Sequence, residues 1–200
     1  MSHMILFLLA SLIAVIYAIG QRNIYKMLSF IFISQISLAL FAFSLEALLG
    51  YVYALSILFP LLALLIISYV VAITSSAEIE KTGGLLSVLP ISAWTFIIAS
   101  LILSLFPPFM PFVLEHFIVE KSLLLGQMTP VAIIILVLIR VLTIVCLFKT
   151  AHKVFFGTPC KLEVKEPKIA SLAIIFVSLS VIITFSPYIW NLVISLGVYE

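Results

Sequence analysis

Residues 88–125 form one apolar stretch that three prolines interrupt. A straight helix over these 38 residues would be about 57 Å long, roughly twice the thickness of the hydrocarbon core of a bilayer. Pro107, Pro108 and Pro111 each disturb the backbone hydrogen bonding that such a helix needs. The stretch therefore predicts two half-helices separated by a break at Pro107–Pro111. The carbonyl groups freed there must be satisfied by protein or by water.

The rest of the chain is as apolar as this stretch. Of its 200 residues, 65% are hydrophobic and 9% are charged, and none is aspartate. A water-soluble domain cannot bury so much apolar surface, so the sequence predicts an all-α integral membrane protein with residues 1–200 as one membrane domain. About six spans are expected, and the fourth is the broken one. Their predicted ranges are Met4–Gly20, Met27–Leu49, Tyr51–Ser75, Val88–Leu125, Pro130–Lys149 and Ile169–Val198.

The distribution of cations predicts the orientation. If six spans alternate, eight of the ten lysines and arginines fall on one side of the membrane and only Lys121 falls on the other. By the positive-inside rule the cation-rich side is cytoplasmic, and both termini lie on the outer side. The localisation expected is a multi-pass protein, most simply of a prokaryotic cell membrane. The cations follow topology and form no patch for nucleic acid, so no nucleic-acid partner is expected.

Five ionisable residues are candidates for ion translocation: Glu115, His116, Glu120, Arg140 and Lys149. We expect Glu115 in the first turn of the second half-helix, where unpaired N–H groups and the helix dipole favour an anion. A structural cap or an ion pair at a subunit interface is the alternative use of this carboxylate. Arg140 lies about ten residues into the fifth span and needs a counter-ion there, either Glu115 or a carboxylate of a neighbouring subunit.

The other three candidates have simpler alternatives. His116 and Glu120 are four residues apart and share a helix face, so either can extend a proton wire toward the outer side or serve only in packing. Lys149 lies at the cytoplasmic end of its span, where an interfacial cation and an access funnel are both consistent with its position. Cys146 and Cys160 have no second thiol at metal-ligand spacing. No catalytic site, cofactor-binding residue or metal site is predicted in this chain.

Four segments, in this order along the chain, carry a resemblance to a known family. They are Gln21–Phe30, Glu78–Leu85 ending in Gly-Gly-Leu, Pro107–Glu115, and Leu142–Gly157. Together they resemble the antiporter-like membrane subunits of respiratory complex I, Mrp-type Na⁺/H⁺ antiporters and membrane-bound energy-converting hydrogenases. The chain resembles only the second five-helix repeat of such a subunit plus its terminal helix. Glu115 then falls at the family's lysine-or-glutamate position on the broken helix.

The resemblance implies a membrane subunit of a multi-subunit redox-driven ion pump that contributes part of an H⁺ or Na⁺ path. Its expected partners are lipid and the other membrane and peripheral subunits of an oxidoreductase complex. Iron–sulfur clusters are expected in those partners, together with a nickel–iron site if the complex is a hydrogenase, and no cofactor is expected in this chain. Gln35, Ser56 and Pro60 stand where the family has histidine, histidine and lysine. These departures favour the alternative, a transport-inactive structural subunit that bridges membrane modules.

Overall fold

The computed structural model describes residues 2–104, 109–124, 126, 130–157 and 166–185. Within them the chain forms seven α-helices and two short 3₁₀ helices, and it is all-α as expected. The α-helices are α1 (Ser2–Ile19), α2 (Ile24–Leu45), α3 (Ala47–Thr74), α4 (Pro90–Leu103), α5 (Met110–Leu124), α6 (Pro130–Phe155) and α7 (Ile169–Phe185). The 3₁₀ helices η1 (Ile79–Lys81) and η2 (Leu85–Ser87) lie between α3 and α4.

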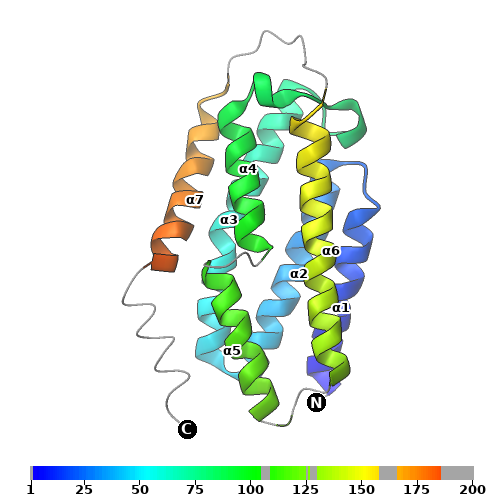
Figure 1. The fold of residues 1–200 in the computed structure, drawn as a ribbon, viewed down its shortest axis with the longest axis vertical. Coiled ribbons are helices and arrows are strands. Elements are labelled where there is room, and N and C mark those ends of the chain that lie inside the picture. Colours follow the sequence, from blue (N-terminus) through cyan, green and yellow to red (C-terminus); the bar gives the residue numbers. More distant parts are fainter. Residues whose placement is uncertain (1, 105–108, 125, 127–129, 158–165, 186–200) are drawn as a thin grey trace.

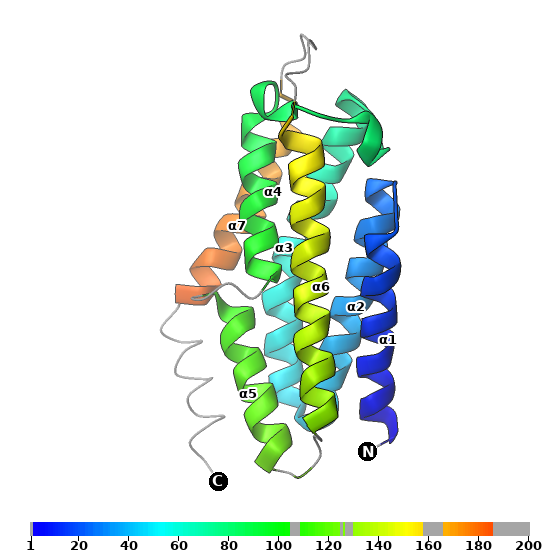
Figure 2. The same cartoon turned by 45° about the vertical axis from the view of Figure 1, so that its right-hand side comes forward.

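The helices form an elongated bundle whose members run along its long axis (Figure 1). α1 packs against α2 and α6, while α3 packs against α2, α4 and α7. Turning the molecule shows α6 beside both α1 and α4 (Figure 2). Consecutive helices alternate in direction, except that α5 continues in the direction of α4 (Figure 1). Side chains far apart in the sequence therefore reach the same level in the interior.

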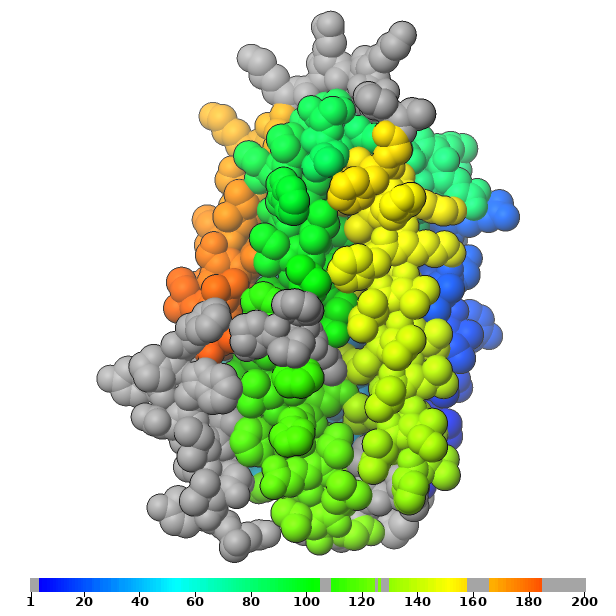
Figure 3. Space-filling view, viewed as in Figure 1, coloured from blue at the N-terminus to red at the C-terminus, as the bar shows by residue number. Residues whose placement is uncertain are grey.

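Length and apolarity show which helices can cross a bilayer. α2, α3 and α6 are each long and apolar enough to span it alone, and the described parts of α1, α4 and α7 form shorter apolar helices. Large apolar side chains such as Trp94, Val131 and Ile182 cover the outside of the bundle. On the face in Figure 3, α6, α4, α5 and α7 lie side by side. The protein is a multi-pass membrane protein.

The predicted break in the fourth span is confirmed. α4 ends at Leu103 and α5 begins at Met110, and the two helices follow one another along the long axis (Figures 1 and 2). Their 14 and 15 residues make each about 21–23 Å long, too short to cross alone. The backbone N–H of Met110 donates to Oγ1 of Thr184 on α7, 3.3 Å away. Pro111 lies in the first turn of α5, where its missing N–H does little harm, and Pro107 and Pro108 lie outside the described residues.

Three helix ends differ from the expected ones by at least four residues. α2 ends at Leu45 and α3 begins at Ala47, so the turn between them is centred on Glu46 and not on Gly50. A tight turn is possible there because Gly50 has no side chain: a Cβ at this position would lie 2.6 Å from Cα of Phe43. α6 continues to Phe155, six residues beyond its expected end.

The segment before α7 is attached to the start of α4. Glu166 accepts hydrogen bonds from the backbone N–H groups of Ile91 (3.1 Å) and Ser92 (2.6 Å), and from Oγ of Ser92 (2.6 Å). A carboxylate at a helix N-terminus satisfies otherwise unpaired donors and is favoured by the helix dipole. Glu166 therefore links two spans that are more than seventy residues apart.

Candidate ion-translocation site

A single ion pair lies among the described residues in the middle of the bundle, between Glu115 of α5 and Arg140 of α6. Oε2 of Glu115 is 2.6 Å from Nη2 of Arg140. The two residues are only 5% and 6% exposed. The sequence left two alternative counter-ions for Arg140, and in the structure its counter-ion is Glu115 of the same chain.

Arg140 has two further partners, contributed by α2 and α3. Its Nη1 donates to Oε1 of Gln35, 3.1 Å away, and its Nη2 donates to the hydroxyl of Tyr53. Gln35 and Tyr53 are both fully buried. The guanidinium therefore joins four helices around one positive charge.

The site also has polar atoms without a hydrogen-bond partner in the described part of the chain. They are Nε2 of Gln35, Nε of Arg140 and both carboxylate oxygens of Glu115, all of them buried, although Oε2 keeps its ionic contact with Arg140. Two donors and one acceptor are thus close to the ion pair and not satisfied by protein groups. Buried polar groups of this kind are the ones that internal water satisfies.

The depth of the site follows from the position of Arg140 in α6. This helix begins at Pro130, and ten residues at about 1.5 Å each place Arg140 roughly 15 Å from that end. This is half of a hydrocarbon core about 30 Å thick. A membrane surface at Pro130 would therefore place the ion pair near the middle of the bilayer.

Glu115 does not occupy the position within α5 that the sequence led us to expect. The helix begins at Met110, so the carboxylate lies in the second turn and not in the first. Thr184 bonds the first N–H of the helix instead. The main stabilisation of the Glu115 carboxylate is therefore the charge of Arg140, and a role as helix cap is wrong.

His116 and Glu120 are not part of the buried cluster. Both are exposed on the outside of α5, on a different side of the helix from Glu115. Lys121, next in the chain, forms an ion pair with Glu46 at the end of α2. A part for His116 and Glu120 in a proton wire stays a prediction from the sequence.

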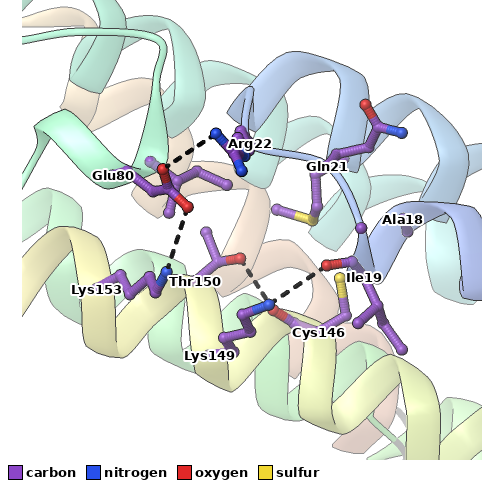
Figure 4. A pocket seen from close by; sticks show the side chains of 12 residues that line it. Ala18, Ile19, Gln21, Arg22, Glu80, Cys146, Lys149, Thr150 and Lys153 are labelled. Atoms are coloured by element: carbon purple, nitrogen blue, oxygen red, sulfur yellow. Dashed lines mark hydrogen bonds and ion pairs between the residues drawn. The ribbon is translucent and has the colours of Figure 1, made fainter.

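Lys149 lies at the other end of α6 from Pro130, in a small cluster of charges (Figure 4). Its Nζ is 3.4 Å from the carbonyl oxygen of Ile19, the last residue of α1. It is nine residues from Arg140, so about 13 Å of helix separates it from the ion pair. The buried Thr143 lies between them along α6, and the buried Thr150 comes directly after Lys149.

Tyr53 is the member of the cluster that the sequence did not indicate. A tyrosine in an apolar span resembles the aromatic residues that lie at the membrane surface, and its depth depends on where α3 begins. Gln35 was recognisable as a polar side chain within a span, but its partner was not. The described residues contain no group of three or more histidine, cysteine, aspartate or glutamate side chains that could hold a metal ion.

Residues 2–145 match the membrane domain described as NADH:quinone oxidoreductase/Mrp antiporter, TM. The chain belongs to this family. Among its curated relatives is the uncharacterized protein MJ1309 of Methanocaldococcus jannaschii, which is 26% identical over 95% of the chain and 42% of its own length. The chain thus spans less than half the length of this relative.

The fold of this antiporter-family chain is also found in a solved structure. A chain of the Mrp complex from Dietzia sp. DQ12-45-1b superposes with a TM-score of 0.71 at 18% sequence identity. The match covers 98% of the present chain and 45% of the Mrp chain. At this identity the likeness concerns the fold alone. The family resemblance expected from the four sequence segments is confirmed.

Proposed function

We propose that this chain is a membrane subunit of a multi-subunit, redox-driven ion pump and contributes part of its H⁺ or Na⁺ path. In this proposal Glu115 is the group that binds and releases the ion. The observation that carries the proposal is the buried pair of Glu115 and Arg140 at mid-membrane depth. Ionised side chains cost about 2.5–3.5 kcal/mol at the bilayer centre, so they are kept there chiefly for function.

Glu115, and not Arg140, is the group able to exchange an ion. A guanidinium does not give up its proton inside a protein, whereas a carboxylate can take up H⁺ or Na⁺. When Glu115 is neutralised, Arg140 still has Gln35 and Tyr53 as hydrogen-bond acceptors. These two neighbours lower the cost of opening the ion pair, since the arginine is not left without partners.

The unsatisfied atoms around the pair support this role. Nε2 of Gln35 and Nε of Arg140 are buried donors without protein partners in the described residues. Water bound by these donors would bring a proton-exchanging molecule to Oε1 of Glu115. A bare carboxylate enclosed only by apolar side chains would have no such route.

The length of the chain supports a place within a larger assembly. It covers 42% and 45% of the two antiporter-family proteins compared with it, so other subunits would supply the remaining half of the path. The candidate assemblies for this subunit are an Mrp-like complex, complex I and an energy-converting hydrogenase. The redox cofactors, iron–sulfur clusters among them, would be in partner subunits.

The test replaces the carboxylate by an amide of the same shape. We expect E115Q to abolish coupled ion pumping. The single change also leaves Arg140 without its buried counter-charge, which costs up to about 3–5 kcal/mol. The hydrogen bonds to Gln35 and Tyr53 offset only part of that cost. We therefore add the double variant E115Q/R140Q, which removes both charges and should restore assembly but not pumping.

A matched control is E78Q, the same substitution at an exposed glutamate that pairs with Lys81 on the cytoplasmic side. Its pumping should equal that of the wild type. If the double variant assembles and pumps normally, Glu115 is not the exchanging group. That result would favour the second candidate, a structural subunit without transport, which the presence of Pro60 within α3 at the family's lysine position also favours.

A further inference from the structure

A small polar cavity lies at the cytoplasmic end of the bundle, between the end of α1, the end of α6 and the loop that contains η1 (Figure 4). Its volume is about 130 Å³. Four charged residues line it: Arg22, Glu80, Lys149 and Lys153. Three of them are cations and one is an anion, so the cavity carries a net charge of +2 (3 − 1).

The single carboxylate does not neutralise these cations closely. Glu80 lies between two of them, with Oε2 3.8 Å from Nη1 of Arg22 and Oε1 4.0 Å from Nζ of Lys153. Close ion pairs of this type are about 2.7–2.9 Å long, and Lys81 makes such a pair with Glu78 at 2.8 Å. Arg22 and Lys153 therefore retain most of their capacity to bind another anion.

The third cation is also weakly bound. Within the described part of the chain, Nζ of Lys149 reaches only the carbonyl oxygen of Ile19, at 3.4 Å, and an ammonium has three donors. Met27 and Cys146 form part of the cavity floor, so the cavity lining is charged on one side and apolar on the other. Such an electropositive site repels H⁺ and Na⁺ and attracts a compact anion with several acceptor oxygens.

We propose that this cavity binds a phosphate group, supplied by the headgroup of an anionic lipid or by free phosphate. Its position favours the lipid. The cations are on the predicted cytoplasmic side, where anionic lipids attract basic residues. Exposed apolar side chains of both helices, Tyr17 on α1 and Phe148 on α6, lie within about one turn of the cavity and offer a surface for acyl chains.

Removing a cation and removing the carboxylate should have opposite effects on phosphate-group binding. Each cation near an anionic surface contributes about 1 kcal/mol, so R22Q, K149Q and K153Q should each weaken phosphate-group binding about five-fold. E80Q removes the carboxylate that competes for Arg22 and Lys153, and it should strengthen binding by a similar factor. K168Q serves as the charge-matched control, because Lys168 is an exposed cation on the same side but outside the cavity.

The experiment titrates the full chain in neutral detergent with phosphatidylglycerol, and in separate arms with phosphatidylcholine of the same chain length and with inorganic phosphate against chloride. Bound lipid is counted by native mass spectrometry, and the thermal unfolding midpoint reports both ligands. Binding of phosphatidylglycerol alone that follows the predicted order of variants supports the proposal with lipid as the source. Binding of inorganic phosphate with the same order supports it with free phosphate as the source. Equal binding by all variants, or no preference for phosphatidylglycerol or phosphate, would overturn it.

Discussion

Arg140 connects four helices in the interior of the bundle. It contacts Glu115, Gln35 and Tyr53, which come from three other helices. In water these interactions would be weak, but a buried charge that loses a partner has no solvent to replace it. The stability of the bundle should therefore depend on each neighbour of this one guanidinium.

Tyr53 provides the simplest test of this dependence. Y53F removes the hydroxyl that accepts a hydrogen bond from Arg140 and leaves the ring in place. Hydrogen bonds to charged groups contribute about 1.5–3 kcal/mol, and we expect a loss of that size in the free energy of unfolding, measured by denaturant titration in detergent. Y51F is the control on the same helix, because Tyr51 is 63% exposed. Equal stability of the two variants would show that the hydroxyl of Tyr53 contributes nothing.

The residues of the site differ in how far the sequence revealed them. A charge in an apolar span requires a counter-ion, and this rule gave two candidates for Arg140: Glu115 or a carboxylate of a neighbouring subunit. No such rule selects Tyr53, whose ring is equally at home in lipid, in the core or at the membrane surface. Which polar side chains surround an ion pair depends on the rotation of each helix about its own axis, and apolarity on every side of a span leaves that rotation undetermined.

At the scale of elements, the break between α4 and α5 was predictable because proline acts on its own backbone. The boundary between α2 and α3 was not, because the residues around Glu46 are apolar on both sides and contain no proline. The cap that Glu166 makes on α4 was also hidden, since it joins residues 74 positions apart. Local effects such as a proline break can be predicted from a membrane-protein sequence, whereas contacts between distant segments depend on how the helices pack.

Gly50 is the element-scale feature that a single substitution tests. G50A places a Cβ 2.6 Å from the backbone of Phe43, so α2 and α3 must separate. Overpacking of this kind costs about 1–3 kcal/mol, and we expect a lower thermal unfolding midpoint in detergent. G20A is the matched control, because a Cβ there meets its nearest atom, the carbonyl oxygen of Tyr17, at an ordinary 3.7 Å. An unchanged midpoint for G50A would mean that the turn opens without cost.

At the scale of the whole molecule, the two ends of the bundle differ in charge. Arg22, Lys81, Lys149 and Lys153 lie around the α1–α2 turn, the η1 loop and the end of α6, which are all at one end (Figure 1). The opposite end carries Lys121, which is paired with Glu46. The structure thus keeps together the cations that the sequence assigned to the cytoplasm, except for Lys161 and Lys165, which lie outside the described residues.

The orientation itself is a prediction that labelling can check. In a variant whose two natural cysteines are replaced by serine, L124C should react with a membrane-impermeant thiol reagent added outside intact cells. K81C should react only after the membrane is opened. Leu124 is 74% exposed and the side chain of Lys81 is 69% exposed, so burial within the chain prevents neither reaction. The reverse pattern would invert the assigned topology.

The contact of Glu166 with the start of α4 has a mechanical consequence. One end of α4 is bonded to the segment that leads into α7, and the other end lies at the break before α5. A force on that segment would therefore act through a rigid helix of 14 residues on the break itself. A neighbouring subunit that bound the segment around Glu166 would thus act on α4 without contacting the buried ion pair.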